Sequence, residues 1–156
     1  ESQLQVVRVL RKHQPDIVLM NAPTDRHPDH GRASRLVEEA CFLSGLHKIV
    51  IKDGDTVLEP WRPKTMYKYL QFYNLEPQVV VDISEGFEKK IASIKAHKSQ
   101  FFDPNSIEPE TIIASEGFFK SVIARAQDWG RVIGAAYAEP LISVRHIGLK
   151  NLEDLQ

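Results

Sequence analysis

Two histidines and two aspartates fall within six residues of one another: Asp25, His27, Asp29 and His30. They follow an apolar run at residues 17–20 and precede an amphipathic helical pattern, so they lie where a predicted strand passes into a helix. In open α/β sheets, ligands bind at the carboxyl ends of the strands. Neutral imidazole is the commonest zinc-binding side chain, and carboxylates complete many catalytic zinc sites. The stretch therefore predicts half of a metal-dependent hydrolase site.

The spacing of the two histidines leaves their roles open. His27 and His30 are three residues apart across the start of a helix, so both rings are expected on the same side. Either both bind one metal, or one binds it while the other acts on the substrate. Asp25 and Asp29 are close enough to orient an imidazole through its second nitrogen. The alternative is chance spacing and an aspartate that only caps the helix.

The elements that position this stretch alternate between helices and strands. Apolar spacing predicts a helix that Pro15 ends, and residues 16–21 suit a strand buried on both faces. Pro28 suits the first position of the next helix, and Gly45 suits its end. The pattern predicts an α/β fold, Rossmann-like in its layers, with a mostly parallel sheet flanked by helices. The other predicted elements are strands at 48–51, 66–73 and 79–83, a strand or extended loop at 135–145, helices at 84–101 and 115–130, and a loop at 103–109.

Composition excludes several functional classes. The chain has 156 residues, enough for one domain with a core, and is 42% apolar and 26% charged, as in ordinary globular proteins. A net charge of −1 gives no bulk attraction to nucleic acid or to anionic membranes, and no apolar stretch approaches a membrane span. The single cysteine, Cys41, excludes an intrachain disulfide and fits a reducing compartment. We therefore expect neither nucleic-acid nor membrane partners, and a cytoplasmic location.

His27-Pro28-Asp29-His30 resembles the second signature motif of the LmbE/PIG-L family of zinc-dependent N-deacetylases. Further segments match in the family's order, and together they resemble its bacillithiol-biosynthesis branch over nearly the whole chain. These segments are Asp16-Ile17-Val18, Asp25-Arg26, Gly31-Arg32-Ala33, Phe42-Leu43-Ser44-Gly45-Leu46, Trp61-Arg62-Pro63, Ala96-His97-Lys98-Ser99-Gln100 and Tyr137-Ala138-Glu139-Pro140.

The resemblance implies a role for each residue of the motif. At the position of His30 the family has a zinc ligand, and at that of His27 a histidine that polarises or protonates the tetrahedral intermediate. The position of Asp29 orients its neighbouring histidine. The family's first motif, Ala-His-Pro-Asp-Asp, supplies the other ligands and the general base, and it does not occur in these residues. Residues 1–156 thus resemble the C-terminal portion of a single deacetylase domain, and Glu1 already falls within a helical pattern. We expect an N-terminal segment of the same protein as a partner.

The implied activity is zinc-dependent hydrolysis of the N-acetyl group of an N-acetylglucosaminyl conjugate, with N-acetylglucosaminyl-malate as the expected substrate. Such an acetylated amino-sugar glycoside would need cations for its carboxylates, and Arg26 and Arg62 are candidates because guanidinium binds carboxylate bidentately. His97 is a candidate pocket residue. The structural alternatives are a surface ion pair for Arg62 beside a packed Trp61, and a helix-face position for His97. The family also commonly forms homo-oligomers.

Two other classes of function compete with this hypothesis. A non-catalytic binding or regulatory domain could retain the fold without a complete zinc site, which agrees with the missing motif. A nucleotide-binding α/β domain is disfavoured, because no G-x-G-x-x-G or Walker-type loop follows any predicted strand.

Overall fold

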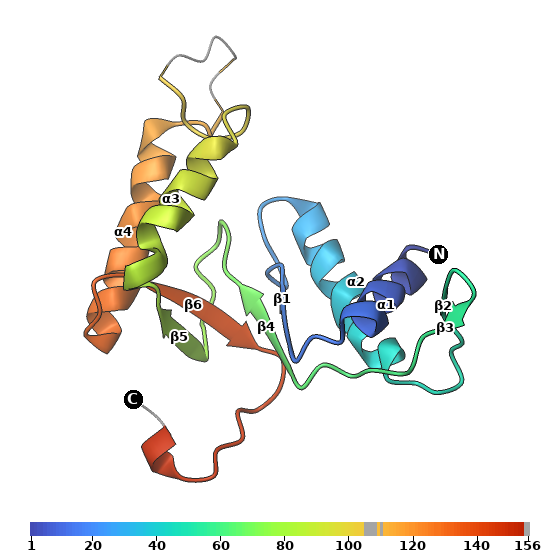
Figure 1. The fold of residues 1–156 in the computed structure, drawn as a ribbon. Coiled ribbons are helices and arrows are strands. Elements are labelled where there is room, and N and C mark those ends of the chain that lie inside the picture. Colours follow the sequence, from blue (N-terminus) through green and yellow to red (C-terminus); the bar gives the residue numbers. More distant parts are fainter. Residues whose placement is uncertain (105–108, 110, 155–156) are drawn as a thin grey trace. The chain divides into compact units, whose positions relative to one another are not determined.

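The computed structural model describes residues 1–104, 109 and 111–154, which form two compact units. Unit 1 comprises Glu1–Val79 and Leu141–Gln156, and unit 2 comprises Val80–Pro140. Residues 105–108 of the loop predicted at 103–109 lie outside the described residues. In chain order (Figure 1), the elements are α1 (Ser2–His13), β1 (Ile17–Met20), α2 (Pro28–Ser44), β2 (Lys52–Asp53), β3 (Thr56–Val57), β4 (Thr65–Tyr69), β5 (Val79–Asp82), η1 (Ser84–Gly86), α3 (Phe87–Ala96), α4 (Glu116–Ile133), β6 (Ala138–Ser143) and η2 (Leu152–Asp154).

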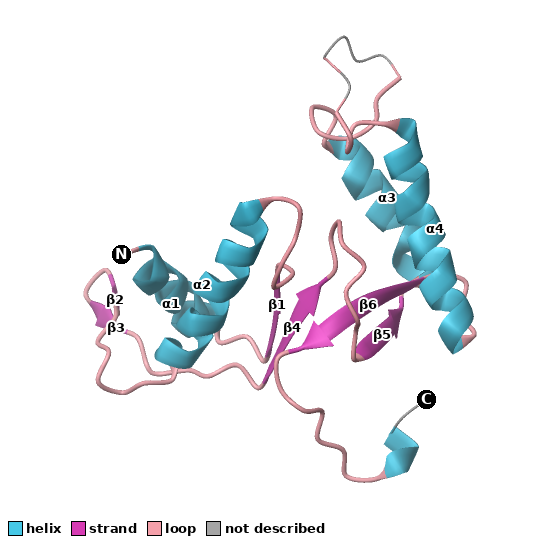
Figure 2. Cartoon of the chain, turned by 180° about the vertical axis from the view of Figure 1, so that it is seen from behind, coloured by secondary structure: helices cyan, strands magenta, loops and turns pink. Residues whose placement is uncertain are grey.

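The main sheet has the strand order β1-β4-β6-β5 (Figure 2). Strand β1 is parallel to β4, with Ile17 opposite Thr65 and Met20 opposite Lys68, whereas β4 is antiparallel to β6. The predicted α/β class, with helices flanking a sheet, is confirmed. The sheet is mixed, because β6 runs back along β4.

Strand β1 is covered on one face only, so the prediction of burial on both faces is wrong. Met20 is buried and Val18 packs against the core, but Ile17 and Leu19 are each 59% exposed. Successive side chains of a strand point to opposite faces, which accounts for this alternation. The apolar run predicted the strand correctly, but it could not show whether anything covers its second face.

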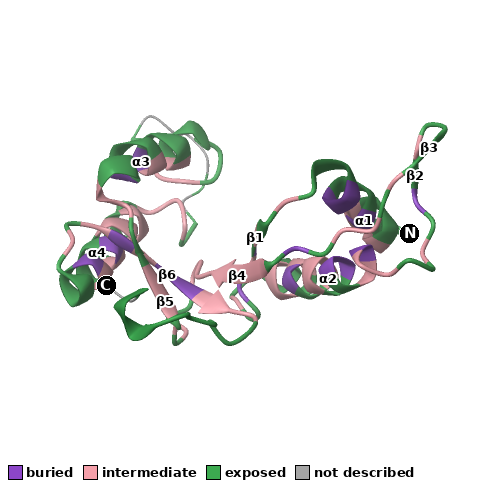
Figure 3. Ribbon diagram, turned by 60° about the horizontal axis from the view of Figure 1, so that its bottom comes forward, coloured by how far each residue is buried: buried purple, intermediate pink, exposed green. Residues whose placement is uncertain are grey.

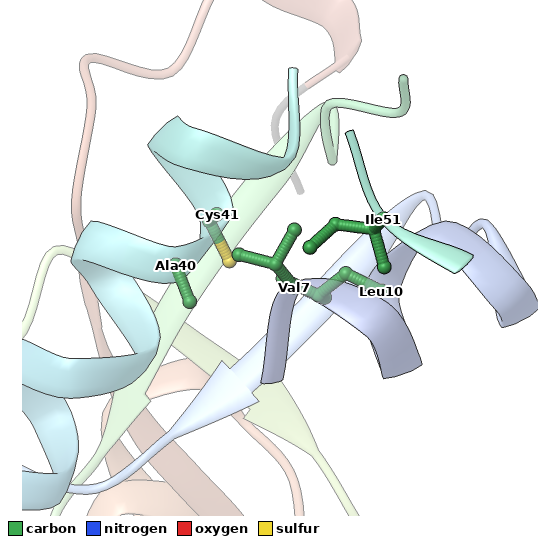
Figure 4. Close-up of a cluster of buried hydrophobic side chains, with 5 residues drawn as sticks. All are labelled: Val7, Leu10, Ala40, Cys41 and Ile51. Carbon is green, nitrogen blue, oxygen red and sulfur yellow. The ribbon is translucent and has the colours of Figure 1, made fainter. Parts of the chain in front are cut away.

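The core of unit 1 lies between α1, α2 and the segment that leads into β2. Figure 4 shows its buried members: Val7, Leu10, Ala40, Cys41 and Ile51. Figure 3 shows buried segments of α1 and α2 among exposed and intermediate ones, as expected for amphipathic helices. Burial raises the pKa of the Cys41 thiol to about 11, and nearby Glu38 adds to this shift, so the cysteine is a core residue as predicted.

Arg11 is only 2% exposed and fixes the C-terminal end of α2. Its Nε donates to the carbonyl of Ser44 at 3.0 Å, and its terminal nitrogens donate to the carbonyls of Leu46 at 2.8 Å, Ile49 at 2.7 Å and Leu58 at 3.4 Å. The last carbonyls of a helix lack partners within the helix and carry partial negative charge, and the buried guanidinium supplies a donor to that of Ser44, the last residue of α2. Its other three bonds hold carbonyls of the chain that follows the helix. Helix α2 is therefore anchored at its C-terminal end.

Unit 2 is built on α3 and α4. Phe87, Ile91 and Ala126 form its buried cluster, and the ring of Phe87 stacks on that of Tyr137 with centroids 3.5 Å apart. Ser115 caps α4, since its hydroxyl accepts the N–H of Phe118 at 3.1 Å.

Several predicted boundaries are wrong. Helix α4 continues past Gly130 to Gly134, whose φ of 74° suits glycine at a helix end. Gly130 lies inside the helix, where a Cβ would come within 2.7 Å of the carbonyl oxygen of Ala135. Ser84 bonds Asp82 in place of capping a long helix, and α3 ends at Ala96. The strand predicted at 48–51 is displaced to β2, which forms a hairpin with β3.

Candidate functional site

The polar stretch lies where β1 ends and α2 begins, as the sequence predicts. His27 is the N-cap of α2, with extended backbone angles of −87° and 124°, and Pro28 takes the first helical position. Because β1 and β4 are parallel, both end at the same edge of the sheet. The stretch therefore meets the segment that follows β4.

His30 is held by Asp25. The Nδ1 atom of its imidazole lies 2.6 Å from Oδ2 of Asp25, whose side chain is only 1% exposed, whereas that of His30 is 36% exposed. An ionised carboxylate accepts hydrogen bonds only, so Nδ1 carries a proton, and in the neutral ring Nε2 keeps its lone pair. Burial opposes ionisation of Asp25, but bonds from His30 and from the backbone N–H groups of Arg26, Phe72 and Tyr73 outweigh it and hold its pKa below the ordinary value.

His27 has the opposite arrangement. Its Nδ1 accepts the backbone N–H of Asp29 at 3.3 Å, so the neutral ring carries its proton on Nε2. The two imidazoles lie side by side, with ring centroids 5.5 Å apart. Nε2 of the neutral His30 ring therefore offers a lone pair, whereas Nε2 of the neutral His27 ring offers a proton.

The carboxylate of Asp29 is exposed and points to another partner. It accepts a bond from Arg32 at 3.0 Å and lies 3.8 Å from Nδ1 of His27. The contact that orients His27 in this structure is thus the backbone N–H of Asp29. That the Asp29 carboxylate orients a histidine stays a prediction.

Sequence reasoning missed the segment that follows β4. The backbone N–H groups of Phe72 and Tyr73 donate to Oδ1 of Asp25 at 3.1 Å and 3.3 Å. The side-chain oxygen of Gln71 accepts the side-chain N–H of Asn21 at 3.1 Å. Residues 66–73 are predicted as a strand and their aromatic side chains as packing or interface residues, whereas β4 ends at Tyr69. No local signal marks these N–H groups, because their partners lie 47 and 48 residues away.

The other predicted site residues differ in their surroundings. Arg26 lies beside the motif, with its guanidinium carbon 5.5 Å from the centre of the Phe72 ring. Arg62 donates to the carbonyl of Phe42 at 2.9 Å and stacks on the Phe42 ring, at the C-terminal end of α2. At about 1.5 Å per residue, Phe42 is roughly 18 Å along the helix from His30. The contacts of Arg62 here are those of a helix cap, and its part in substrate binding stays a prediction.

His97 belongs to unit 2, where it directly follows α3. Its N–H donates to the carbonyl of Ile94 at 3.1 Å, and its carbonyl accepts the N–H of Gln100 at 2.9 Å. These are helix-end contacts of the backbone. A pocket role for the His97 ring stays a prediction.

Comparison with known proteins adds to this geometry. The chain is 32% identical over 143 residues to the diacetylchitobiose deacetylase of Thermococcus kodakarensis, across 89% of this chain and 49% of that protein. It resembles a sugar deacetylase. The chain spans about half the length of this relative. No family model matches it.

Two solved structures are similar in fold. The conserved protein TT1542 of Thermus thermophilus superposes with a TM-score of 0.79 at 28% identity, across 96% of this chain and 61% of that one. The N,N'-diacetylchitobiose deacetylase of Pyrococcus horikoshii has a TM-score of 0.69 at 28% identity, across 99% of this chain and 56% of its own. The α/β fold is thus one that a deacetylase also adopts.

Among the described residues of the candidate site, His30 has the arrangement expected of one metal ligand. A metal-binding histidine ordinarily donates its second ring N–H to a carboxylate, as His30 does to Asp25. Within the described part of the chain, no group of three or more histidine, cysteine, aspartate or glutamate side chains could hold a metal ion. The described residues also include no helix long and apolar enough to cross a membrane.

Proposed function

We propose that residues 1–156 are part of a metal-dependent N-deacetylase that hydrolyses the N-acetyl group of an N-acetylglucosamine-containing glycoside. The observation that carries the proposal is the opposite hydrogen bonding of the adjacent His27 and His30 rings. Amide hydrolysis on a metal needs both a lone pair that binds the metal and a proton donor beside it. Similarity to a diacetylchitobiose deacetylase supports the same reaction class.

Each histidine then has one task. Nε2 of His30 would hold the metal, and Asp25 keeps that ring in the binding tautomer. A zinc ion held there would supply an acidified water and a charge that polarises the acyl oxygen. Nε2–H of His27 donates to the oxyanion or protonates the leaving amine, a contribution of about 10²- to 10⁴-fold for a positioned acid. Arg26, exposed beside the motif, binds an anionic or hydroxyl group of the substrate.

The remaining ligands and the general base come, in this proposal, from an N-terminal segment outside these residues. Catalytic zinc usually takes three protein ligands, and the described residues supply His30. The chain spans about half of its deacetylase relative, which leaves room for such a segment. A non-catalytic binding domain is the second candidate, because the described residues do not complete a site.

The finer substrate proposal is N-acetylglucosaminyl-malate of bacillithiol biosynthesis. The relatives are named for diacetylchitobiose, which shares the N-acetylglucosamine but carries no carboxylate. Arg26 favours the malate conjugate, since its guanidinium lies exposed next to the motif. A cytoplasmic location and homo-oligomers complete the proposal. Comparing acetate release from the two substrates decides between them.

The decisive experiment measures metal content per chain after dialysis, together with acetate release. We expect about one zinc when three ligands are present. His30→Ala should lose the metal, whereas His27→Ala should keep it and lower turnover by about 10²- to 10⁴-fold. Unchanged zinc in His30→Ala would contradict the ligand assignment. Neither retained metal nor acetate release, with or without added zinc, would favour the non-catalytic domain.

A further inference from the structure

The carboxylate of Asp25 joins two segments that are distant in sequence. One oxygen lies 2.6 Å from Nδ1 of His30, and the other accepts the N–H groups of Phe72 and Tyr73. Only 1% of its side chain is exposed, so water does not compete for these bonds. Asp25 is thus fixed from one side by the segment after β4, and it in turn fixes the imidazole on its other side.

Further contacts hold the same two segments together. Oε1 of Gln71 accepts the side-chain N–H of Asn21 at 3.1 Å and the backbone N–H of Ala22 at 3.4 Å. Gly31 allows the chain to pass close to α2, because a Cβ there would lie 3.0 Å from the carbonyl oxygen of Pro23. The segment that carries Asp25 therefore has bonds to the segment after β4 and close packing on α2.

We propose that Asp25 is a positioning residue for His30: held by the Phe72 and Tyr73 N–H groups, it fixes the imidazole in the tautomer whose Nε2 can bind a metal. The use of that lone pair rests on the function proposed above, but the tautomer itself does not. Asp29 does not position His30, because its carboxylate is 67% exposed and accepts a hydrogen bond from Arg32. Asp25 acts only through His30 and does not touch the substrate.

The sharpest test is Asp25→Asn, which keeps the shape of the side chain. The amide oxygen can still accept the two backbone N–H groups, but the amide nitrogen then faces Nδ1 of His30 and donates to it. We expect the His30 proton to move to Nε2, as read by ¹⁵N NMR shifts of the ring at about pH 8, where an ordinary imidazole is neutral. In protein that binds zinc, affinity should fall by about 10- to 100-fold, as for other carboxylates that support metal-bound histidines.

The matched control is Asp16→Asn, which removes the same charge from an exposed aspartate paired with Lys64. It should leave the His30 tautomer unchanged. If Asp25→Asn does not fold, Gly31→Ala provides a second test: it keeps every ionisable group but displaces the Pro23 carbonyl, and with it the segment that carries Asp25. A mixture of His30 tautomers is then expected.

An unchanged His30 tautomer in a folded Asp25→Asn protein would overturn the inference. When Asp25→Asn cannot be studied, so would a uniform Nδ1–H tautomer in a Gly31→Ala protein that has lost the contact between Asp25 and His30. Failure of the proposed function gives a different result. A protein without deacetylase activity, but whose tautomer switches in Asp25→Asn, would refute the enzyme and leave the positioning role intact.

Discussion

The two ends of α2 show two uses of polar groups. At the C-terminal end, the buried Arg11 donates to the carbonyl of Ser44 and to three carbonyls of the chain beyond the helix, and Arg62 donates to the carbonyl of Phe42. At the N-terminal end, His27 accepts one backbone N–H, and its exposed ring keeps a proton free to donate. The first end uses its polar side chains to hold the fold. The second keeps polar atoms available for chemistry, beside the fixed pair Asp25 and His30.

The largest expected effect is at the buried end. Arg11→Met should lower the free energy of unfolding by about 3 kcal/mol, because it removes the hydrogen bonds of a buried charged group, at roughly 1.5–3 kcal/mol for a bond that involves a charge. The carbonyls of Ser44 and Leu46 keep a backbone donor, whereas that of Ile49 loses the donor that Arg11 supplies. Urea unfolding measures the loss. The control is Arg8→Met on the exposed face of the same helix, which should stay within about 0.5 kcal/mol of the unsubstituted chain. Equal losses of stability in Arg11→Met and Arg8→Met would show that the buried contacts of Arg11 do not hold the fold.

His27→Ala should cost less stability than Arg11→Met, although it removes the proposed proton donor. Loss of an N-cap typically costs about 0.5–2 kcal/mol, and the bond here is long and exposed, so we expect about 1 kcal/mol or less. Urea unfolding under the same conditions gives this value. A loss as large as that of Arg11→Met would show that His27 is structural, and would weaken its catalytic assignment.

Arg62→Ala should have a smaller effect, about 0.5–1 kcal/mol, because its guanidinium is exposed and makes one hydrogen bond to the helix end. Gly45→Ala is the companion variant, since a Cβ there would come within 2.4 Å of Nε of Arg62 and displace it. Similar losses in both variants would support a capping role. A raised KM in Arg62→Ala with unchanged stability would instead place this residue at the substrate.

The smallest effect on stability is expected at Ser34, which lies between the two ends of α2. Among the described residues, Oγ of Ser34 has no hydrogen-bond partner, although the side chain is buried. Ser34→Ala removes an unsatisfied group and improves helix propensity, so stability should rise by up to about 1 kcal/mol. A loss of stability in thermal or urea unfolding would show that the hydroxyl has a partner, such as a bound water.

The local elements of unit 1 could be predicted well from sequence. Pro15, Pro28 and Gly45 mark helix boundaries through effects on their own backbone, and the apolar run at 17–20 marks β1. These signals act within a few residues, so each could be read without the fold. One error arose where a local signal had a tertiary use: the Ser84 hydroxyl accepts the N–H of Tyr137, 53 residues away. Another arose at Gly130, which does not end the helix but lets the chain at Ala135 and Ala136 pass close to it.

In the candidate site too, some features follow from the local sequence and others only from the fold. The positions of His27, Asp29 and His30 at the start of a helix follow from the sequence, because three-residue spacing and a proline fix that geometry locally. The fold was needed to show that Asp25, not Asp29, holds His30, and that Phe72 and Tyr73 hold Asp25. The same is true of Arg11, a residue type that is rarely buried. The partners in these contacts lie 33 to 48 residues away, apart from His30, and they meet only because β1 pairs with β4 and α1 packs on α2.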